Sequence, residues 1–468
     1  MQLFREELTV LNVGIPAFAD AIRQAGGKAI AIEWQPPAGG DRDAGRALAR
    51  LTNDQRVEAA NRSAFAAYLT AEPVLEGIGR AGDVISGMNG HAILHSGPPI
   101  AWSQMCGPMQ GAVIGAILFE GWAVGEEAAR ALAEQGKIAF SPCHHVGAVG
   151  PMAGVISPSM PVWMVRDLTS GRRSFSNLNE GLGKVLRFGA NGPEVIERLT
   201  WMATTLQQVL AATLVEAGPI ALKPLMAQAL HMGDEVHNRN TAATSLLLRR
   251  LLPPMLRSPA SREDVAAVTS FIAGNDHFFL NLSMAACKAM LDAARDVAAS
   301  TMVVAMTRNG VEFGIQLSGT GDRWFTTASP VVDGLYFPGY GIADAAADLG
   351  DSAITETAGL GGFAMAAAPA IVRFVGGTPD DALANTRAMR HVTLGQNGGF
   401  TLPALNFTGT PAGIDARRVL DSGLMPVINT GIAHRKAGIG QIGAGITHAP
   451  LACFTQAVTA LAGTLPDD

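Results

Sequence analysis

Proline and glycine interrupt the most apolar stretches of this chain, and this pattern limits the elements that it can form. The two longest stretches of low charge cover residues 94–119 and 138–165. A helix that spans a membrane needs ~20 continuous apolar residues. Neither stretch supplies them, so we predict buried loops and short elements of a soluble protein without a membrane span. The interrupting prolines are Pro98, Pro99, Pro108, Pro142, Pro151, Pro158 and Pro161.

The composition favours a large buried core and argues against a nucleic-acid partner. The chain has 468 residues, of which 48% are hydrophobic and 16% charged. It is therefore long enough for two or three domains and is not disordered. Lysine and arginine total 34 against 40 acidic residues, a net charge of -6, whereas nucleic-acid-binding proteins carry a basic field. Since few charges coat the surface, we expect broad subunit contacts and a homo-oligomer.

The start of the chain and its cysteines indicate a cytoplasmic protein. The first residues include Arg5, Glu6 and Glu7 and lack a basic-then-apolar leader, so we predict no signal peptide. The four cysteines are far apart and show no CxxC spacing, which argues against a disulfide frame or a zinc knuckle. They are Cys106, Cys143, Cys287 and Cys453.

The order of apolar runs predicts a multidomain α/β fold. Residues 8–33 indicate a strand, a helix opened by Pro16 and a second strand, which is half of a doubly wound unit. This unit lacks the GxGxxG fingerprint of dinucleotide sites. Residues 44–81 are predicted to be mostly helical. We predict a Rossmann-like N-terminal part over 1–82, a Gly/Pro-rich mixed α/β domain over 83–192, a small helical module over 193–260 and a mixed α/β domain over 261–468.

A hairpin is the clearest local signal. The runs TMVVAM and VEFGIQL within 301–317 flank TRNG, and Asn309-Gly310 is a preferred two-residue turn because both residues tolerate positive φ. Strand-like MPVINTG follows much later in the chain. Further helices are predicted near 278–297, 353–373, 379–394 and 449–463.

The segment MNGHAILHSGPPIAW, residues 88–102, is the first candidate for chemistry. His91 and His95 have metal-ligand spacing but lack the glutamate of an HExxH motif, so turn-forming or hydrogen-bonding histidines are favoured over a metal pair. Asn89 and Ser96 each neighbour a glycine, and such turns can offer backbone N–H groups to an anion.

The segment FSPCHHVGAVGP, residues 140–151, places Cys143 beside His144. Adjacent side chains on a strand point to opposite faces, so this pair is a poor nucleophile and base. We favour turn chemistry with one functional histidine.

The densest polar run is MGDEVHNRNTAAT, residues 232–244. If a helix begins here, Asn240 or Thr241 caps it and its free N–H groups favour an anion. Arg239 adds a planar fork suited to carboxylate or phosphate, and His237 could carry a proton. The alternative is a solvated helix start with local ion pairs. We favour function because apolar helices flank the run.

Four further polar runs carry weaker signals. In 273–290, Asp276 could cap a helix beside His277, and Asn281 would need a partner if buried. The turn SGTGDR, 318–323, could cradle phosphate or be only a turn. HRKAGIGQIGAG, 434–445, matches GxGxxG without the preceding strand, so an anion loop is a better interpretation than a dinucleotide site. In 348–363, Asp351 and Glu356 could bind a cation or cap a helix.

Taken together, these runs resemble a bacterial family that includes a subunit of oxamate carbamoyltransferase. The resemblance extends over nearly the whole chain, from LNVGIPAFADAIR through NGHAILHSGPPIAW, GDEVHNRNTAAT and TRNGVEFGIQLSGTGDRWF to NTGIAHRKAGIGQIGAG. It implies a Rossmann-like N-terminal part, mixed α/β parts and a helical part. It also implies a role in purine or allantoin degradation, in a complex that interconverts oxalurate plus phosphate with oxamate plus carbamoyl phosphate. An acyl-CoA-synthetase-like partner subunit is implied as well.

The resemblance assigns no catalytic residue, so the candidates follow from the residue types alone. Carbamoyl transfer needs anion clamps, donors to the carbonyl oxygen and a proton carrier. We expect the segments 88–102, 140–151 and 232–244 to share one cleft that binds a small anionic substrate. No cofactor is predicted and a divalent metal is not excluded, so a non-catalytic scaffold or a metal-dependent ureido or amide hydrolase are the alternatives. The candidate proton carriers are His91, His144 and His237, and the candidate binding residues are Asn89, Ser96, Arg239, Asn240, Arg308, Ser318 and Thr320.

Overall fold

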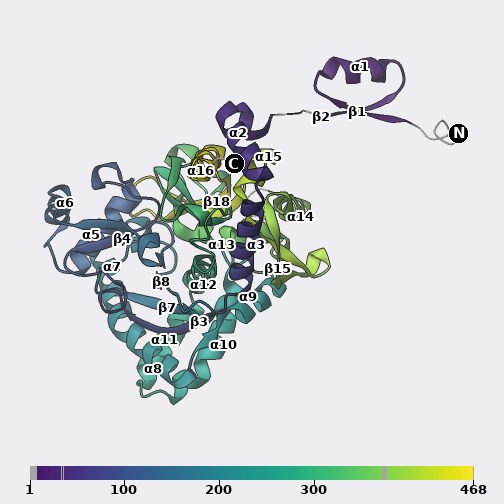
Figure 1. Ribbon diagram of the computed structural model, residues 1–468. Coiled ribbons are helices and arrows are strands. Elements are labelled where there is room, and N and C mark those ends of the chain that lie inside the picture. The colour runs from purple at the N-terminus through teal and green to yellow at the C-terminus, as the bar shows by residue number, and fades with distance from the viewer. Residues whose placement is uncertain (1–7, 33, 35, 371–376, 467–468) are drawn as a thin grey trace.

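The computed structural model describes residues 8–32, 34, 36–370 and 377–466. These residues form helices and several small sheets (Figure 1), which confirms the multidomain α/β class. No helix among them combines the length and the apolar character needed to cross a membrane.

The N-terminal unit stands apart from the body of the molecule (Figure 1). Strand β1 (Thr9–Val13) and strand β2 (Lys28–Ile32) pair in parallel, and helix α1 (Pro16–Gln24) connects them. Pro16 occupies the first turn of the helix, where its missing N–H costs nothing. The predicted strand–helix–strand unit is therefore confirmed.

Two helices connect this unit to the central sheet. Helix α2 (Arg42–Asn53) contacts the C-terminal helix α16 (Leu451–Ala462), and helix α3 (Gln55–Thr70) leads to strand β3 (Pro73–Arg80). The helical prediction for residues 44–81 is thus wrong in its last third. The helix ends before Pro73, and the apolar residues that follow are buried in a sheet instead.

The central sheet has the order β6-β8-β7-β3-β9 and is mostly antiparallel. This one sheet combines strands from three of the four parts predicted from the sequence. The proposed division of the chain into four parts therefore stays a prediction. Its other strands are β6 (Ala148–Val149), β7 (Pro161–Asp167), β8 (Arg173–Asn177) and β9 (Ile220–Ala221).

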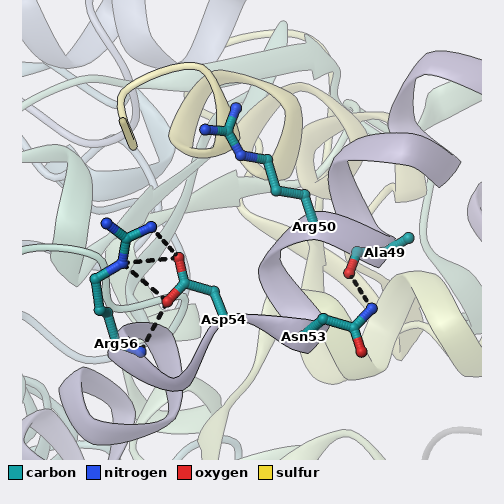
Figure 2. A pocket seen from close by; sticks show the side chains of 5 residues that line it. All are labelled: Ala49, Arg50, Asn53, Asp54 and Arg56. Carbon is teal, nitrogen blue, oxygen red and sulfur yellow. Dashed lines mark hydrogen bonds and ion pairs between the residues drawn. The ribbon is translucent and has the colours of Figure 1, made fainter. Parts of the chain in front are cut away.

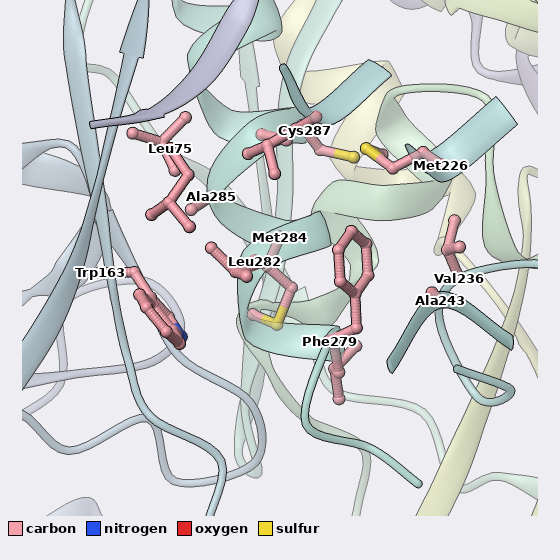
Figure 3. Close-up of a cluster of buried hydrophobic side chains, with 14 of the residues drawn as sticks. Leu75, Trp163, Met226, Val236, Ala243, Phe279, Leu282, Met284, Ala285 and Cys287 are labelled. Atoms are coloured by element: carbon pink, nitrogen blue, oxygen red, sulfur yellow. The ribbon is translucent and has the colours of Figure 1, made fainter. Parts of the chain in front are cut away.

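Helix α12 (Leu280–Asp292) forms the centre of the largest core, and every residue in it is buried. Figure 3 shows its side chains between Leu75 and Trp163 on the sheet side and Val236 and Ala243 on the opposite side. The helix also buries Asn281, whose amide bonds Asn177 and Asn179 as the sequence required. The core therefore supports both the sheet and the polar run at 232–244.

A second parallel unit lies on the other side of the sheet. Strands β4 (Ala92–His95) and β5 (Ala139–Pro142) pair in parallel. Helices α5 (Gly107–Phe119) and α6 (Glu126–Glu134) lie between them in the chain. A short helix, α4 (Ala81–Val84), precedes this unit. The apolar stretches that proline interrupts thus form short buried elements, as predicted.

Residues 193–273 are mostly helical, while the division of the chain into separate parts stays a prediction. The helices of this segment are α7 (Pro193–Trp201), α8 (Gln207–Ala217), α9 (Leu222–His231), α10 (Thr241–Arg257) and α11 (Arg262–Ala273).

The C-terminal half contains the predicted hairpin, with one difference in its turn. Strands β10 (Val303–Asn309) and β11 (Glu312–Leu317) pair antiparallel. Only Gly310 has positive φ (80°), whereas the Asn309 side chain accepts from the N–H groups of Val311 and Glu312. Asn309 therefore closes the turn through its amide oxygen and not through its backbone angle.

Three sheets complete this half. Strands β12 (Phe325–Ala328) and β14 (Leu349–Gly350) flank the hairpin. Strands β13 (Asp333–Tyr336), β17 (Val427–Ala433) and β18 (Gln441–His448) form a second sheet, and β15 (Thr393–Leu402) pairs with β16 (Thr408–Ile414). The remaining helices are α13 (Ile354–Thr357), α14 (Pro379–Ala388) and α15 (Ala416–Ser422).

The helix predicted over 353–373 is not formed. Only α13 is α-helical there, and a 3-10 segment at 361–367 follows, while residues 371–373 lie outside the described residues. Gly359 and Gly361 adopt φ of 80° and 54°, which ends the helix. Residues 348–367 instead form a buried connection that leads from the hairpin sheet towards α14.

A buried ion pair anchors the hairpin to this connection. The Arg308 Nε and Nη2 atoms donate to the two oxygens of Asp348 at 2.7 and 2.9 Å, and Nη1 donates to the Gly350 carbonyl at 2.7 Å. Both side chains are buried. Removing one partner would leave the other charge buried and unpaired.

We expect Arg308→Met to lower the free energy of unfolding by about 3–5 kcal/mol, because it leaves the Asp348 carboxylate unpaired. Arg257→Met is the matched control, since its pair with Glu216 is exposed and is worth about 1 kcal/mol or less. Urea denaturation followed by circular dichroism measures both. Equal losses in the two variants would contradict a structural role for the buried pair.

Candidate active site

Two more buried carboxylates on the same connection organise the loops around it. Asp351 accepts from the N–H groups of Gly97 and Gly150 at 2.9 and 3.0 Å, and from the Thr307 hydroxyl. Burial raises the pKa of Asp351 to about 6. The segments 88–102 and 140–151 therefore meet in the interior at one carboxylate.

His144 lies beside Asp351 but is enclosed. Its Nε2 atom is 3.6 Å from Asp351 Oδ1, and neither ring nitrogen has a hydrogen-bond partner. Burial lowers the pKa of His144 well below its usual value, and the charges of Lys288 and Arg295 act in the same direction. The imidazole is consequently neutral at physiological pH.

Glu356 has the same organising role for the polar run at 232–244. Its Oε1 atom accepts from His237 Nδ1 at 2.7 Å and from the Gly362 N–H at 2.8 Å. A Cβ on Gly361 would lie 2.2 Å from Glu356 Oε1, so only glycine fits this approach. Asp351 and Glu356 thus neither cap an exposed helix nor face solvent, in contrast to the sequence-based alternatives.

A third carboxylate, Glu235, shapes the loop from within. It accepts from the N–H groups of Asn238 and Arg239. Burial raises the pKa of Glu235 to about 7, against the opposing effect of the neighbouring His237. Between them Val236 adopts φ of 59°, which is strained for a β-branched residue. Such strain is common at functional sites.

The loop enters helix α10 differently from the prediction. Asn240 occupies the N-cap position, yet its Nδ2 atom donates to the His237 carbonyl at 2.5 Å. The side chain that caps the helix is Asp234, whose Oδ2 accepts from the Ala243 N–H at 2.8 Å. The amide oxygen of Asn240 therefore does not accept from the first turn of α10.

A pocket of about 460 Å³ lies where this loop meets two other polar runs. Asn238, Arg239 and Asn240 come from the 232–244 run, and Asp276 and His277 precede helix α12. Gln441 begins β18. The full lining is Leu182, Gly183, Asn238, Arg239, Asn240, Thr241, Asp276, His277, Phe337, Gln441 and Ala444.

Several buried polar atoms at this pocket lack hydrogen-bond partners. They are Asn238 Nδ2, Arg239 Nε and Asn240 Oδ1, each on a lining residue. Arg239 Nε lies 3.4 Å from Asp234, an ion pair that does not meet hydrogen-bond geometry. Buried polar groups in folded proteins are normally satisfied. Unsatisfied donors and acceptors around one cavity therefore point to a polar ligand.

His277 is the imidazole that lines this pocket. Burial lowers its pKa to about 4, and the nearby charge of Arg187 adds to the effect. The ring is thus neutral, and its Nε2 atom lies 3.0 Å from the Asn238 carbonyl. Because a carbonyl only accepts, Nε2 carries the hydrogen and Nδ1 is left as an acceptor. The sequence showed His277 only beside a predicted cap at Asp276, but Phe279 occupies that N-cap.

The other predicted site residues lie elsewhere. Asn89 and His91 are exposed, and the His91 ring packs 4.5 Å from that of Trp122. Ser96 is buried and donates to the Met152 carbonyl. Ser318 and Thr320 donate to the carbonyls of Ala294 and Leu317. With Arg308 held by Asp348, these contacts favour structural roles.

The expectation of one shared cleft is wrong for this pocket, because no residue of 88–102 or 140–151 lines it. His237 lies behind the lining residues, where it holds Asn240. The GxGxxG match also fails as a dinucleotide loop, since Gly438 and Gly440 form the turn between antiparallel strands β17 and β18. Within the described part of the chain, no three His, Cys, Asp or Glu side chains are grouped so as to hold a metal ion.

A second hollow of about 340 Å³ lies at the junction of α2 and α3 (Figure 2). There the Asp54 carboxylate and the Arg56 guanidinium form an ion pair at 2.7 Å, and Asn53 bonds the Ala49 carbonyl. Arg50 donates to the Leu465 carbonyl, so the polar groups of this hollow have partners within the protein. We assign no chemistry to this hollow.

The chain is similar to several known proteins. Residues 138–352 match the family described as oxamate carbamoyltransferase subunit AllG. The oxamate carbamoyltransferase subunit AllG of Escherichia coli (strain K12) is 49% identical over 413 residues, which cover 87% of this chain and 98% of that protein. The uncharacterized protein YahG of the same organism is 46% identical over 459 residues, or 97% of each chain. A conserved protein of unknown function from Enterococcus faecalis V583, known from a crystal structure, is 48% identical with a TM-score of 0.87. It covers 88% of this chain and 98% of its own.

The raised pKa of Glu235 predicts a pH-dependent stability. Between about pH 4.5 and 7 the folded protein retains a proton on Glu235 that the unfolded chain releases, so its contribution to stability falls as pH rises through this window. Glu235→Gln abolishes that fall. We expect the unfolding free energy of this variant, relative to the wild type, to increase from pH 4.5 to 7.5 by on the order of 3 kcal/mol.

Urea denaturation at several pH values measures this difference, with Glu216→Gln in an exposed ion pair as the control. A difference between Glu235→Gln and the wild type that does not change with pH would show that Glu235 is ionised in the folded protein.

Proposed function

The chain belongs to the oxamate carbamoyltransferase subunit AllG family, and from this premise we propose that its pocket at Arg239 and His277 binds the reactants of carbamoyl transfer. The resemblance found in the sequence is thereby confirmed at the level of the family. The observation that supports the pocket is the set of unsatisfied buried polar atoms on Asn238, Arg239 and Asn240.

We propose the interconversion of oxalurate plus phosphate with oxamate plus carbamoyl phosphate. A phosphate oxygen attacks the terminal ureido carbon of oxalurate, and a C–O bond forms. The bond from that carbon to the oxamate nitrogen then breaks. The proton of the hydrogen phosphate passes to the departing nitrogen, so charge and atoms balance. Both reactants are anions, and the reaction needs clamps for them and a proton carrier.

The cations of the site suit such anions. Arg239 lines the pocket, and its planar guanidinium matches a carboxylate or phosphate. Arg187 is buried beside His277, and its Nε atom has no partner. Burial lowers the pKa of Arg187 to about 10, so it stays charged at neutral pH. The positive charges of Arg239 and Arg187 offset the negative charge of the buried carboxylates behind the 232–244 loop.

The polar neutral groups supply the remaining roles. The Asn238 amide donates to the carbonyl oxygen as charge develops on it. The Nδ1 atom of His277 accepts the phosphate proton and returns it to the oxamate nitrogen. The backbone carbonyl of His237 accepts from Asn240 Nδ2 while Glu356 holds the His237 ring, so His237 is a positioning residue. The partner subunit is the acyl-CoA-synthetase-like protein implied by the family resemblance.

Arg239 provides the first test of this assignment. In the assembled complex we expect Arg239→Met to lower kcat/KM by about 10- to 150-fold, since a hydrogen bond to a charged group contributes about 1.5–3 kcal/mol. The same variant should lose the rise in melting temperature that oxamate or carbamoyl phosphate gives the wild type. Arg250→Met on the exposed face of α10 is the control. If Arg239→Ala and His237→Ala both leave turnover unchanged, the 232–244 run is structural and the chain is a scaffold.

His277 provides the second test. His277→Gln keeps a donor for the Asn238 carbonyl but lacks the Nδ1 acceptor. We therefore expect kcat to fall by about 10²–10⁴-fold with a smaller change in KM, while the melting temperature stays near that of the wild type. A glutamine variant with full kcat, beside an inactive His277→Ala, would reduce His277 to a support for Asn238.

A further inference from the structure

One face of the N-terminal β1–β2 sheet is covered by helix α1, and the other face is exposed to solvent. In the parallel register Leu11 lies opposite Ile30, and Val13 lies opposite Ile32, so these four side chains share one face. Helix α1 covers the other face, where Asn12 is buried. The four aliphatic residues are exposed by 62%, 53%, 59% and 42% in that order. The sheet thus presents an aliphatic face to solvent.

A sheet of this kind is incomplete by itself. Parallel strands occur almost only where both faces are covered, and an isolated two-stranded sheet is marginally stable at best. Within the described residues no third strand pairs with β1 or β2, so both outer edges are open. Residues 9–32 therefore form a fragment of a doubly wound sheet whose remaining strands are not in the described chain.

A second copy of the same face is a poor cover. The face of two five-residue strands measures roughly 17 by 10 Å, or about 170 Å², so two copies joined through this face alone bury far less than the ~800 Å² that a stable interface buries on each partner. A partner that also pairs with a strand edge and contacts helix α1 buries more. A two-fold axis would also place identical edges antiparallel, which does not extend a parallel sheet. A second copy could also offer the edge of a parallel sheet in its body. Among the described residues, the only two-stranded parallel sheet there is β4–β5, which has four residues in each strand and is a short edge for docking.

We propose that residues 9–32 dock as a preformed unit on a different subunit, where β1 or β2 extends the open edge of a parallel α/β sheet. Docking buries Leu11, Val13, Ile30 and Ile32 under the partner's helices and pairs the outer edge of one strand with a strand of the partner. This inference goes beyond carbamoyl transfer, because it requires no residue of the pocket.

The test uses the full chain, alone and co-expressed with the acyl-CoA-synthetase-like subunit. Hydrogen exchange is measured on the amides of 9–13 and 28–32. We expect at least tenfold slower exchange of these amides in the complex than in the isolated chain. We also expect the double variant Leu11→Ser/Ile30→Ser to weaken association at least tenfold. The control Val215→Ser/Leu256→Ser removes two other exposed aliphatic residues, 87% and 68% exposed, and should bind normally.

Three results would overturn the proposal. The first is that the wild-type chain does not bind the subunit, and the second is that amide exchange at 9–32 is the same in the complex as in the isolated chain. The third is that these amides become more protected in the isolated chain as its concentration rises. The last result would assign the face to a second copy. The double variant Leu11→Ile/Ile30→Val keeps the face aliphatic and should retain binding, which separates loss of the face from loss of the unit's fold. The choice of partner rests on the proposed function, which turnover of the pocket variants reports separately.

Discussion

Three buried carboxylates on one short connection organise the C-terminal half of this protein, and two of them, Asp351 and Glu356, bond it to loops from earlier in the chain. Asp348 neutralises Arg308, Asp351 gathers the backbone of two glycine loops, and Glu356 binds His237. A buried carboxylate is costly unless it is paired or hydrogen-bonded. The connection and the loops that supply its partners therefore depend on one another. Many polar side chains of the predicted runs thus bond one another in the interior and do not face a ligand.

The same principle separates the pocket from the interior clusters. Around Asp351 the carboxylate oxygens accept from backbone donors, and the unpartnered ring nitrogens of His144 are fully enclosed. Around Arg239, donors and acceptors on three consecutive residues are left unsatisfied on the lining of a cavity. The strained Val236 is held between Glu235 and the α12 core, so the protein fixes the geometry of these residues before any ligand arrives. We interpret that difference as the mark of the binding site.

Periodicity and turn chemistry were sufficient to predict the N-terminal unit, the helices within 193–260 and the 301–317 hairpin, because these are local signals. The helix over 353–373 failed since its alanine-rich pattern gave no sign that Asp351 and Glu356 would be buried among distant partners. The 232–244 run was recognisable by its polar density. His277 and Gln441 were not, because only tertiary contacts bring them to Arg239. Arg308, a predicted binding residue, pairs with the internal carboxylate of Asp348, and its position in the sequence gave no sign of that partner.

The most direct measurement is a crystal structure of the chain soaked with oxamate and phosphate. The account predicts an anion in contact with Arg239, with a ligand nitrogen within hydrogen-bond distance of His277 Nδ1 and a ligand oxygen beside Asn238 Nδ2. Ligand density at another place on the chain, with the pocket at Arg239 empty, would contradict it.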